Sequence, residues 1–186
     1  MSRFTVVDSP LTGLKSLERQ KLGDARGFLS RLFCLEELSA AGWQGPVAQA
    51  NHTFTAKRGV VRGLHFQHPP HAETKLVTCI RGAVWDVAVD LRAGSSTFLQ
   101  WHAVELSAHN NRSFLIPQGF AHGFQTLTED CEMVYFHSAP YVADAEAGLS
   151  AQDPRLSIAW PLAIAELSPR DAQHPLLNAQ FKGLTL

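Results

Sequence analysis

The sequence predicts an all-β protein built as an antiparallel sandwich or barrel, and three observations support this fold class. Residues 83–91 alternate with a period of two and have one strongly apolar face, as a strand does. Other short strand candidates recur about every ten residues, with Gly, Pro and Asn between them. Strands do not alternate with helices as in parallel α/β folds, and neither GxGxxG nor GxxxxGK occurs.

The elements follow from the same patterns. We predict strands at 60–67, 76–80, 83–91, 101–106, 113–117 and 132–136. A short helix is predicted at 34–41, ended by Gly42. Prolines at 154, 161, 169 and 175 interrupt the segment 141–186. We therefore expect one domain, 1–186, in which this C-terminal segment packs on the barrel through short helical turns.

Composition excludes several classes of protein. The chain has 186 residues and a net charge of −1, which gives no electrostatic basis for binding nucleic acid or an anionic membrane. No apolar run approaches the roughly 18 residues that a membrane-spanning helix needs, and the first ten residues do not resemble a signal peptide. Cys34, Cys79 and Cys131 are widely spaced, odd in number and without a CxxC motif. We therefore expect reduced thiols in a cytoplasmic protein.

One spacing pattern narrows the fold to a cupin-type jelly roll. Residues 117–122, Pro-x-Gly-x-x-His, resemble the second cupin signature, and His65, Glu73 and Gly82 are spaced as in the first. Metal-binding cupins carry a second histidine where this chain has Gln67. Because an amide binds transition metals less well than imidazole, we expect a metal-free site with no cofactor. His65 and His122 would then be free to act as bases or hydrogen-bonding groups.

Some of these residues suit proton transfer next to a carbonyl group. Such a site needs a base that titrates near neutral pH, a cation where an enolate oxygen forms, and a second acid on the opposite face. His65, Lys75 with Arg62, and Tyr135 could fill these roles. Each also has a structural alternative, since His65 could be a core residue, Lys75 a solvated lysine, and Tyr135 a core partner of Met133.

The motifs together are more specific than any one of them. The chain carries GDARGF (23–28), QANHT (49–53), GVVRGLHFQHPP (59–70), GAVWDVAVDLR (82–92), IPQGFAHGF (116–124) and LSPRD (167–171). In these segments it resembles the dTDP-4-dehydrorhamnose 3,5-epimerase family. The resemblance implies a metal-free homodimer that inverts C3 and/or C5 of a nucleotide-linked 4-keto-6-deoxy sugar, most simply a dTDP sugar. A mono-epimerase or isomerase on a related nucleotide sugar, or a non-catalytic sugar-nucleotide binding module, are the alternatives.

The resemblance also implies roles for individual residues. His65 is the base and Asp171 its partner, Lys75 stabilises the enolate, and Tyr135 protonates from the other face. The implied substrate-binding residues are Arg62, Asn51, Gln49, His122, Arg26, Phe28 and Tyr141. We place His68, His71 and His137 in loops or at the rim.

Two placements depend on local structure. Ser168-Pro169-Arg170-Asp171 has the form of a helix start, so Asp171 could serve as a capping residue as well as the partner of His65. Arg62 and His65 have an odd spacing and would point to opposite faces of a regular strand. Both can face one pocket only if the strand bulges, for which Gly63 is a suitable site.

Three residues depart from the family pattern. Arg31 stands where a glutamate is usual, Phe136 where a lysine is common, and Phe54 where a polar residue is typical. We expect these positions to alter nucleotide or sugar recognition.

Asp86 and Asp90 lie on the polar face of strand 83–91, and we expect both to pair with arginines.

Overall fold

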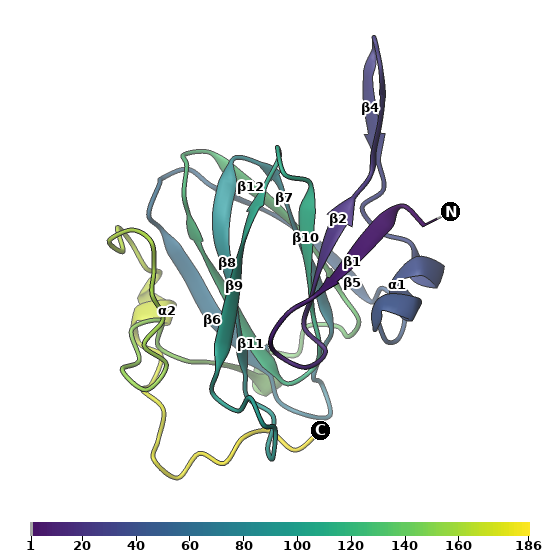
Figure 1. Ribbon diagram of the computed structural model, residues 1–186. Helices are drawn as coiled ribbons and strands as arrows, with labels where there is room; N and C mark the ends of the chain where they lie inside the picture. The colour runs from purple at the N-terminus through teal and green to yellow at the C-terminus, as the bar shows by residue number, and fades with distance from the viewer. Residues whose placement is uncertain (1) are drawn as a thin grey trace.

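Two antiparallel sheets face each other in the computed structural model, which describes residues 2–186 (Figure 1). One sheet has the order β1 (Phe4–Asp8), β2 (Lys15–Arg19), β10 (Arg112–Ile116), β7 (Lys75–Arg81), β12 (Cys131–His137) and β5 (Gln49–Thr55). The other has the order β13 (Glu146–Gly148), β6 (Val61–Gln67), β11 (Phe120–Thr126), β8 (Ala83–Asp90) and β9 (Trp101–Ser107). This arrangement confirms the predicted all-β jelly roll.

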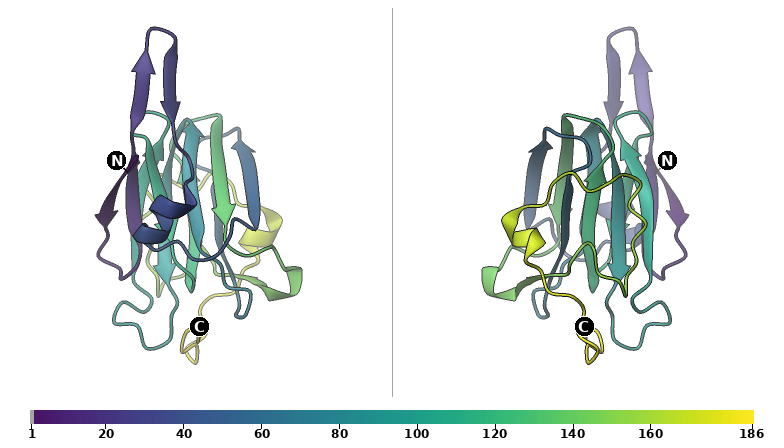
Figure 2. Two further views of the ribbon diagram at one scale, coloured as in Figure 1. Left: turned by 90° about the vertical axis from the view of Figure 1, so that its right-hand side faces the viewer. Right: turned by 90° about the vertical axis from the view of Figure 1, so that its left-hand side faces the viewer.

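The remaining elements lie outside the two sheets. A hairpin of β3 (Lys21–Asp24) and β4 (Gly27–Ser30) projects away from the sandwich (Figures 1 and 2). The helix α1 (Leu35–Ala41) ends as predicted at Gly42, whose φ of 113° is in the left-handed region. The C-terminal segment contains only short elements, as its prolines predict: the 3₁₀ turn η1 (Ala143–Ala145), the strand β13 and the short helix α2 (Pro169–Ala172).

The space between the sheets is filled by side chains at one end and left open at the other. The buried cluster between the sheets consists of Leu11, Leu14, Val77, Cys79, Val84, Ala88, Leu106, Phe114, Ile116, Phe120, Phe124, Cys131, Met133 and Tyr135. Tyr135 lies at the edge of this cluster and also lines the open end. The packed end gives the strands that carry the site a fixed position.

The C-terminal segment covers the outer face of the five-stranded sheet (Figure 2, right). Leu149, Leu156 and Leu177 pack there in the same buried cluster as Val87 and Val89 of β8. The strongly apolar face predicted for β8 therefore lies under this segment and does not face the other sheet. The opposite face, which carries Asp86, points into the sandwich.

On the other side, α1 covers the outer face of the six-stranded sheet. Its buried Leu38 packs with Leu17, Leu76 and Leu115 of three adjacent strands. Both sheets are thus covered on their outer faces, which explains why β7 and β8 are buried along most of their length.

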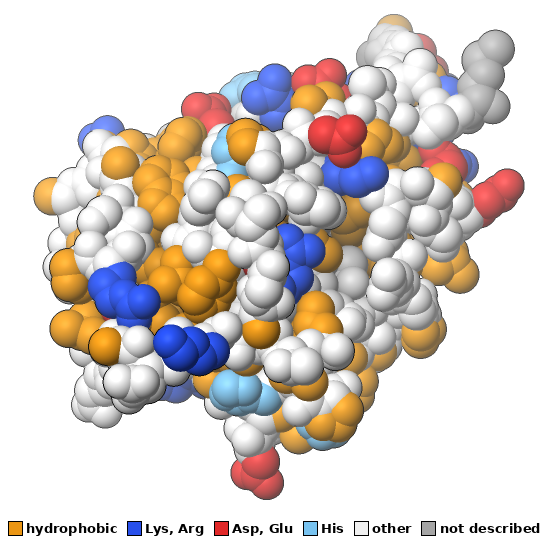
Figure 3. Space-filling model, turned by 60° about the horizontal axis from the view of Figure 1, so that its bottom comes forward, with side chains coloured by type: hydrophobic (Ala, Val, Ile, Leu, Met, Phe, Trp, Pro, Cys, Tyr) orange, Lys and Arg blue, Asp and Glu red, His pale blue; other side chains and the backbone are white. Residues whose placement is uncertain are grey.

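The surface carries charges of both signs. On the face shown in Figure 3, Lys and Arg side chains are scattered among uncharged and hydrophobic ones and do not gather in one patch. Within residues 2–186, no helix has the length and apolar character needed to cross a membrane.

Candidate active site

A cavity of about 710 Å³ opens between the two sheets. Its walls come from β5, β7 and β12 of one sheet and from β6 and β11 of the other, while β13 and α2 contribute to the mouth. Of the predicted site residues, the lining includes His65, Asp171, Tyr135, Lys75, Arg62, Asn51, Gln49, His122 and Tyr141. The fold therefore brings nine of the eleven predicted residues together.

His65 on β6 and Asp171 on α2 form the predicted pair. His65 Nε2 lies 2.7 Å from Asp171 Oδ1, and the carboxylate is almost fully buried while the imidazole remains partly exposed to the cavity. Burial alone would raise the pKa of Asp171, but the hydrogen bond and positive charge of His65 hold it below its usual range. The contact leaves the Nδ1 atom of His65 available to the cavity.

Asp171 also takes part in the N-terminal cap of α2, in which Ser168 is the capping residue. Its backbone N–H donates to the Ser168 hydroxyl at 3.0 Å, with Pro169 in the first turn of α2. Its second carboxylate oxygen accepts the backbone N–H of Gly63 at 3.2 Å. The two readings of Asp171 are therefore compatible, because the cap uses the main chain and the pair uses the side chain.

The bulge at Gly63 is present. His122 of β11 pairs with His65 of β6, and Phe124 of β11 pairs with Arg62 of β6. These pairs are two residues apart on β11 but three residues apart on β6. One extra residue on β6 thus lets Arg62 and His65 line one cavity. Gly63 has a φ of 118°, and a Cβ there would lie 2.6 Å from the Cα of Gly123.

Lys75 is buried beside the pair and is not a solvated lysine. Its ammonium lies 3.0 Å from a Glu73 carboxylate oxygen and 3.4 Å from the carbonyl oxygen of His65. Burial would raise the pKa of Glu73, but the hydrogen bond to His137 and the charge of Lys75 lower it. Glu73 therefore holds a fixed cation at the wall of the cavity.

The side chains at the positions of the cupin metal ligands do not suit a metal. The amide nitrogen of Gln67 donates to Glu73 at 2.9 Å and to the carbonyl oxygen of His71 at 3.0 Å, and its oxygen accepts the Val142 N–H. Glu73 already pairs with Lys75. An amide thus replaces one of the imidazole ligands of a metal-binding cupin, and an ammonium is paired with the carboxylate that would be another ligand.

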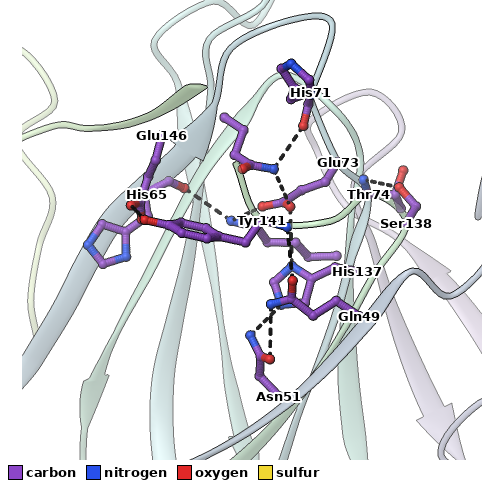
Figure 4. A network of polar contacts seen from close by, with 12 residues as sticks. Gln49, Asn51, His65, His71, Glu73, Thr74, His137, Ser138, Tyr141 and Glu146 are labelled. Carbon is purple, nitrogen blue, oxygen red and sulfur yellow. Dashed lines mark hydrogen bonds and ion pairs between the residues drawn. The ribbon is translucent and has the colours of Figure 1, made fainter. Parts of the chain in front are cut away.

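A chain of polar contacts runs from Glu73 to the loop after β12 (Figure 4). His137 Nδ1 lies 3.5 Å from Glu73, and its Nε2 lies 3.5 Å from the amide nitrogen of Asn51. Gln49 donates to Asn51 and accepts the backbone N–H of Tyr141. His137 was expected at the rim, but it lies inside the cavity. Its position two residues after Tyr135 on one strand face is the signal that could have revealed it.

Tyr135 lies on the opposite wall from His65. It belongs to β12 of the six-stranded sheet, whereas His65 belongs to β6 of the other sheet. Burial raises the pKa of the Tyr135 phenol, so this group stays protonated at neutral pH. Its ring makes an edge-on contact with His122, at 6.1 Å between centroids.

His122 is held by Asp86 from the adjacent strand β8. His122 Nε2 lies 2.9 Å from Asp86 Oδ1, and both groups are buried. Burial raises the pKa of Asp86 although the charge of His122 opposes it. The expectation of an arginine partner is correct for Asp90, which pairs with Arg92, and wrong for Asp86. The register between β8 and β11 decides the partner of Asp86. This register cannot be read from the sequence of one strand.

Three side chains meet at the mouth of the cavity. The phenol of Tyr141 donates to Glu146 at 2.7 Å beside His65 (Figure 4), and Arg170 of α2 pairs with the same carboxylate. Arg170 and Tyr141 together lower the pKa of Glu146 although its burial opposes this. Sequence reasoning placed Tyr141 here but missed Glu146 on β13 and Arg170 on α2, which the path of the C-terminal segment brings to the site.

Arg26 and Phe28 do not join this cavity. Both lie on the projecting β3–β4 hairpin, where the Arg26 side chain is 90% exposed and Phe28 is 63% exposed. Arg26 pairs with Asp24 of its own hairpin. The expectation that these residues join the others must be corrected for a single chain, because the hairpin extends away from the sandwich (Figure 1).

The three departures from the family pattern also lie outside the cavity. Phe54 and Phe136 alternate with the lining residues of β5 and β12, so they face the outer side of the sheet. Phe136 packs there on Phe33. Arg31 pairs with Glu37 of α1. None of the three contacts the cavity of its own chain, which corrects their expected direct role in recognition.

The arrangement defines an enzyme class that moves protons on a small molecule. A buried carboxylate orients an imidazole on one wall, and a protonated phenol and a fixed ammonium occupy the other. Such groups can remove a proton from one face of a carbon next to a carbonyl and return one to the other face. Comparison with known proteins agrees with this class.

Residues 8–179 match the family of dTDP-4-dehydrorhamnose 3,5-epimerases. The dTDP-4-dehydrorhamnose 3,5-epimerase of Salmonella typhimurium is 42% identical over 93% of this chain and 95% of its own. The crystal structure of a Legionella pneumophila 3,5-epimerase in complex with dTDP-4-keto-L-rhamnose superposes with a TM-score of 0.91 at 36% identity, covering 98% of this chain and 99% of that one. A 3′-monoepimerase from Streptomyces bikiniensis in complex with dTDP-quinovose gives 0.84 at 36% identity, covering 90% and 85%.

The chain therefore belongs to the dTDP-4-dehydrorhamnose 3,5-epimerase family. This membership confirms the predicted enzyme class, an isomerase that epimerises a sugar.

Proposed function

We propose that this enzyme epimerises a dTDP-linked 4-keto-6-deoxy sugar by proton abstraction and re-protonation next to the C4 ketone. The observation that carries the proposal is the placement of His65 and Tyr135 on opposite walls of one cavity. Inversion at carbon requires a base on one face and an acid on the other. A protein that only bound the sugar would need neither group. The ligands named for the Legionella and Streptomyces relatives support a dTDP sugar.

His65 is the base in this proposal. With its Nε2–H donated to Asp171, the lone pair on Nδ1 faces the cavity and accepts the proton from C3 or C5. The buried carboxylate fixes this tautomer and stabilises the imidazolium that forms. General base catalysis of this kind contributes about 10²- to 10⁴-fold in rate.

Lys75 and Tyr135 complete the proton transfer. The ammonium of Lys75, held by Glu73, stabilises the negative charge that develops on the C4 oxygen. The phenol of Tyr135 then donates its proton to the carbon from the opposite face. Its raised pKa keeps the phenol protonated until the enolate, a stronger base, is next to it. Arg62, Asn51, Gln49, His122 and Tyr141 bind the substrate around these groups.

Exchange of solvent deuterium tests the proposal. The purified enzyme should incorporate deuterium into dTDP-4-dehydro-6-deoxyglucose in D₂O, as detected by NMR and mass spectrometry. His65→Asn should reduce incorporation by at least about 10²-fold. The proposal fails if the wild-type protein incorporates none. It also fails if His65→Asn exchanges as fast as the wild type.

The number of deuterium atoms separates the two kinds of epimerase. A 3,5-epimerase labels both C3 and C5, whereas a mono-epimerase such as the Streptomyces bikiniensis relative labels one centre. A binding module would label neither. We infer double epimerisation, since the relatives named 3,5-epimerases include the Salmonella protein at 42% identity over 93% of this chain.

We further infer a homodimer in which the β3–β4 hairpin of one subunit reaches the cavity of the other. The hairpin exposes Leu22, Phe28 and Leu29 and has no contact with its own cavity. Exposed apolar side chains on a projecting hairpin are suited to burial against a second copy. In that position Arg26 and Phe28 can bind the nucleotide, as their sequence match implies.

We infer that the enzyme works in the cytoplasm. Cys79 and Cys131 are buried free thiols, and Cys34 is a partly buried one. Free thiols are typical of a reducing compartment.

A further inference from the structure

A second imidazole lies behind the His65–Asp171 pair. His174 follows α2, and its Nε2 atom lies 3.4 Å from Asp171 Oδ1, the same oxygen that contacts His65. The two imidazole rings are 5.5 Å apart between centroids. One nitrogen from each histidine and one carboxylate oxygen lie within 4.8 Å of one another, and this is the one such group among residues 2–186.

The position of His174 is fixed, but its ring nitrogen is unused. Nε2 is buried and has no hydrogen-bond partner. The ring packs against the backbone of Gly148, where any side chain would overlap it. A buried polar atom without a partner is unusual in a folded protein and indicates a ligand or a functional role.

We propose that His65, Asp171 and His174 bind a divalent transition-metal ion of the Zn²⁺ type, and that this binding inhibits the enzyme. Imidazole nitrogen and carboxylate oxygen are the ligands that Zn²⁺ accepts, at about 2.0–2.2 Å in tetrahedral geometry. Two histidines and one carboxylate provide three ligands and leave one position for water. The site is distinct from the cupin metal position, whose groups are occupied by Gln67 and Lys75.

The inhibition follows from the tautomer of His65, and this step rests on the proposed role of His65 as the base. In the metal-free pair the ring proton is on Nε2, and the lone pair on Nδ1 accepts the substrate proton. A metal ion bound to Nε2 displaces that proton, so the one ring proton must be on Nδ1. The base then has no lone pair toward the substrate.

The inhibition should affect turnover more than substrate binding. His174 does not line the cavity, so an ion held between it and Asp171 lies behind His65. Lys75, Tyr135 and the polar residues of β5 stay available to the sugar nucleotide. We therefore expect kcat to fall while KM changes little.

Direct metal binding is the first measurement. Zn²⁺ should bind the substrate-free enzyme with a stoichiometry near one, as measured by calorimetry, and Co²⁺ should give the absorption bands of a nitrogen- and oxygen-ligated site. His174→Ala and His174→Gln should each weaken Zn²⁺ binding by about 100-fold. Loss of a residue that only supports a metal ligand already weakens binding by up to about this factor, and His174 is proposed as a ligand itself. His109→Ala, which removes an exposed histidine of a loop, is the matched control and should bind as the wild type does.

Activity is the second measurement. Zn²⁺ should lower kcat of the wild type and of His109→Ala, EDTA should restore it, and His174→Ala should stay active at the same Zn²⁺ concentration. Zn²⁺ binding that is equally tight in His174→Ala and the wild type overturns the proposal. A rise in KM at constant kcat also overturns it, because it places the ion in the substrate cavity. Failure of the proposed epimerisation would leave the calorimetric result intact, so the two are distinguishable.

Discussion

The carboxylate of Asp171 lies 2.7 Å from the Nε2 atom of His65, although 106 residues separate them along the chain. The other carboxylate oxygen accepts the N–H of Gly63 in the β6 bulge, and the Asp171 backbone is capped by Ser168. One residue of the C-terminal segment therefore orients the base, supports the bulge beside it and is held by the cap of α2. These three contacts can be separated by substitution.

Asp171→Asn should remove catalysis and leave the fold. The amide keeps the size of the carboxylate, and the main-chain cap on Ser168 is unchanged, but the negative charge that stabilises the His65 imidazolium is lost. We expect kcat to fall by about 10²- to 10⁴-fold. Steady-state kinetics and denaturant unfolding check this. Ser168→Ala, which removes the cap alone, should instead cost about 1 kcal/mol of stability. An Asp171→Asn enzyme with wild-type kcat would show that the role of Asp171 is only structural.

Gly63→Ala should disrupt the bulge. Its new Cβ would lie 2.6 Å from the Cα of Gly123 and 2.7 Å from the carbonyl oxygen of His122, and backbone atoms cannot move aside as a flexible side chain can. We expect a loss of about 3 kcal/mol or more in the free energy of unfolding, as for overpacked cores with backbone strain. Gly94→Ala is the matched control, since Gly94 also has a positive φ but has open space around it, and it should cost about 1–2 kcal/mol. Equal losses in the two variants would contradict the steric explanation.

The fold was predictable where strands alternate strongly and are bounded by turn residues. The predicted strands correspond to β6 to β10 and β12. The hairpin β3–β4 was missed because its residues are exposed on both faces, so no apolar periodicity marks it. The predicted pattern of β8 was right, but the direction of its apolar face was not inferable, because the C-terminal segment covers that face.

The site residues were predictable where a sequence motif contains them. Their hydrogen-bond partners were not predictable where the alignment of two strands decides them. His65, Lys75, Tyr135 and Asp171 line one cavity as expected. The partnership of Asp86 with His122 depends on how β8 and β11 align, which no single segment encodes. His174 could have been found from its spacing, since it lies three residues after Asp171 at the end of a helix.

Removal of His122 should destabilise the protein more than removal of Asp86. His122→Phe leaves the buried Asp86 carboxylate unpaired, which should cost about 3 kcal/mol at pH 7, whereas Asp86→Asn removes the charge itself. The folded-state pKa of Asp86 is raised, so its charged form destabilises the folded protein above pH 4 and its protonation relieves this as the pH falls. The loss in free energy of unfolding that His122→Phe causes should therefore be smaller at pH 4.5 than at pH 7, as measured by denaturant unfolding. The variant that carries both His122→Phe and Asp86→Asn should lack this pH dependence. A loss that is constant with pH in His122→Phe would contradict the pairing of His122 with a charged Asp86.

Asp90→Asn tests a purely structural carboxylate. Burial would raise the pKa of Asp90, but hydrogen bonds from Arg92, Ser95 and Thr97 lower it to about 2. Since the folded-state pKa is depressed below the model-peptide value, this group stabilises the protein above pH 4, and the stabilisation is lost as the pH falls toward 2. The variant should lose about 2 kcal/mol at pH 7, with a difference from the wild type that shrinks between pH 4 and pH 2. Because Asp90 does not line the cavity, kcat should not change. A difference that persists at pH 2 would exclude the ionic explanation.

Mixing two inactive variants tests whether the hairpin acts on a partner subunit. His65→Asn removes the base from a cavity, and Arg26→Ala removes the cation from a hairpin that its own cavity does not contact. In a symmetric dimer with exchanged hairpins, each mixed dimer contains one site with both His65 and Arg26 intact, so about a quarter of all sites recover. Turnover measured after the two variants are unfolded and refolded together should rise to about a quarter of the wild-type value, whereas variants refolded separately and then assayed together at once should stay inactive. If each hairpin served its own cavity, no mixed dimer would contain an intact site and activity would not return. That result would contradict the exchange of hairpins between subunits.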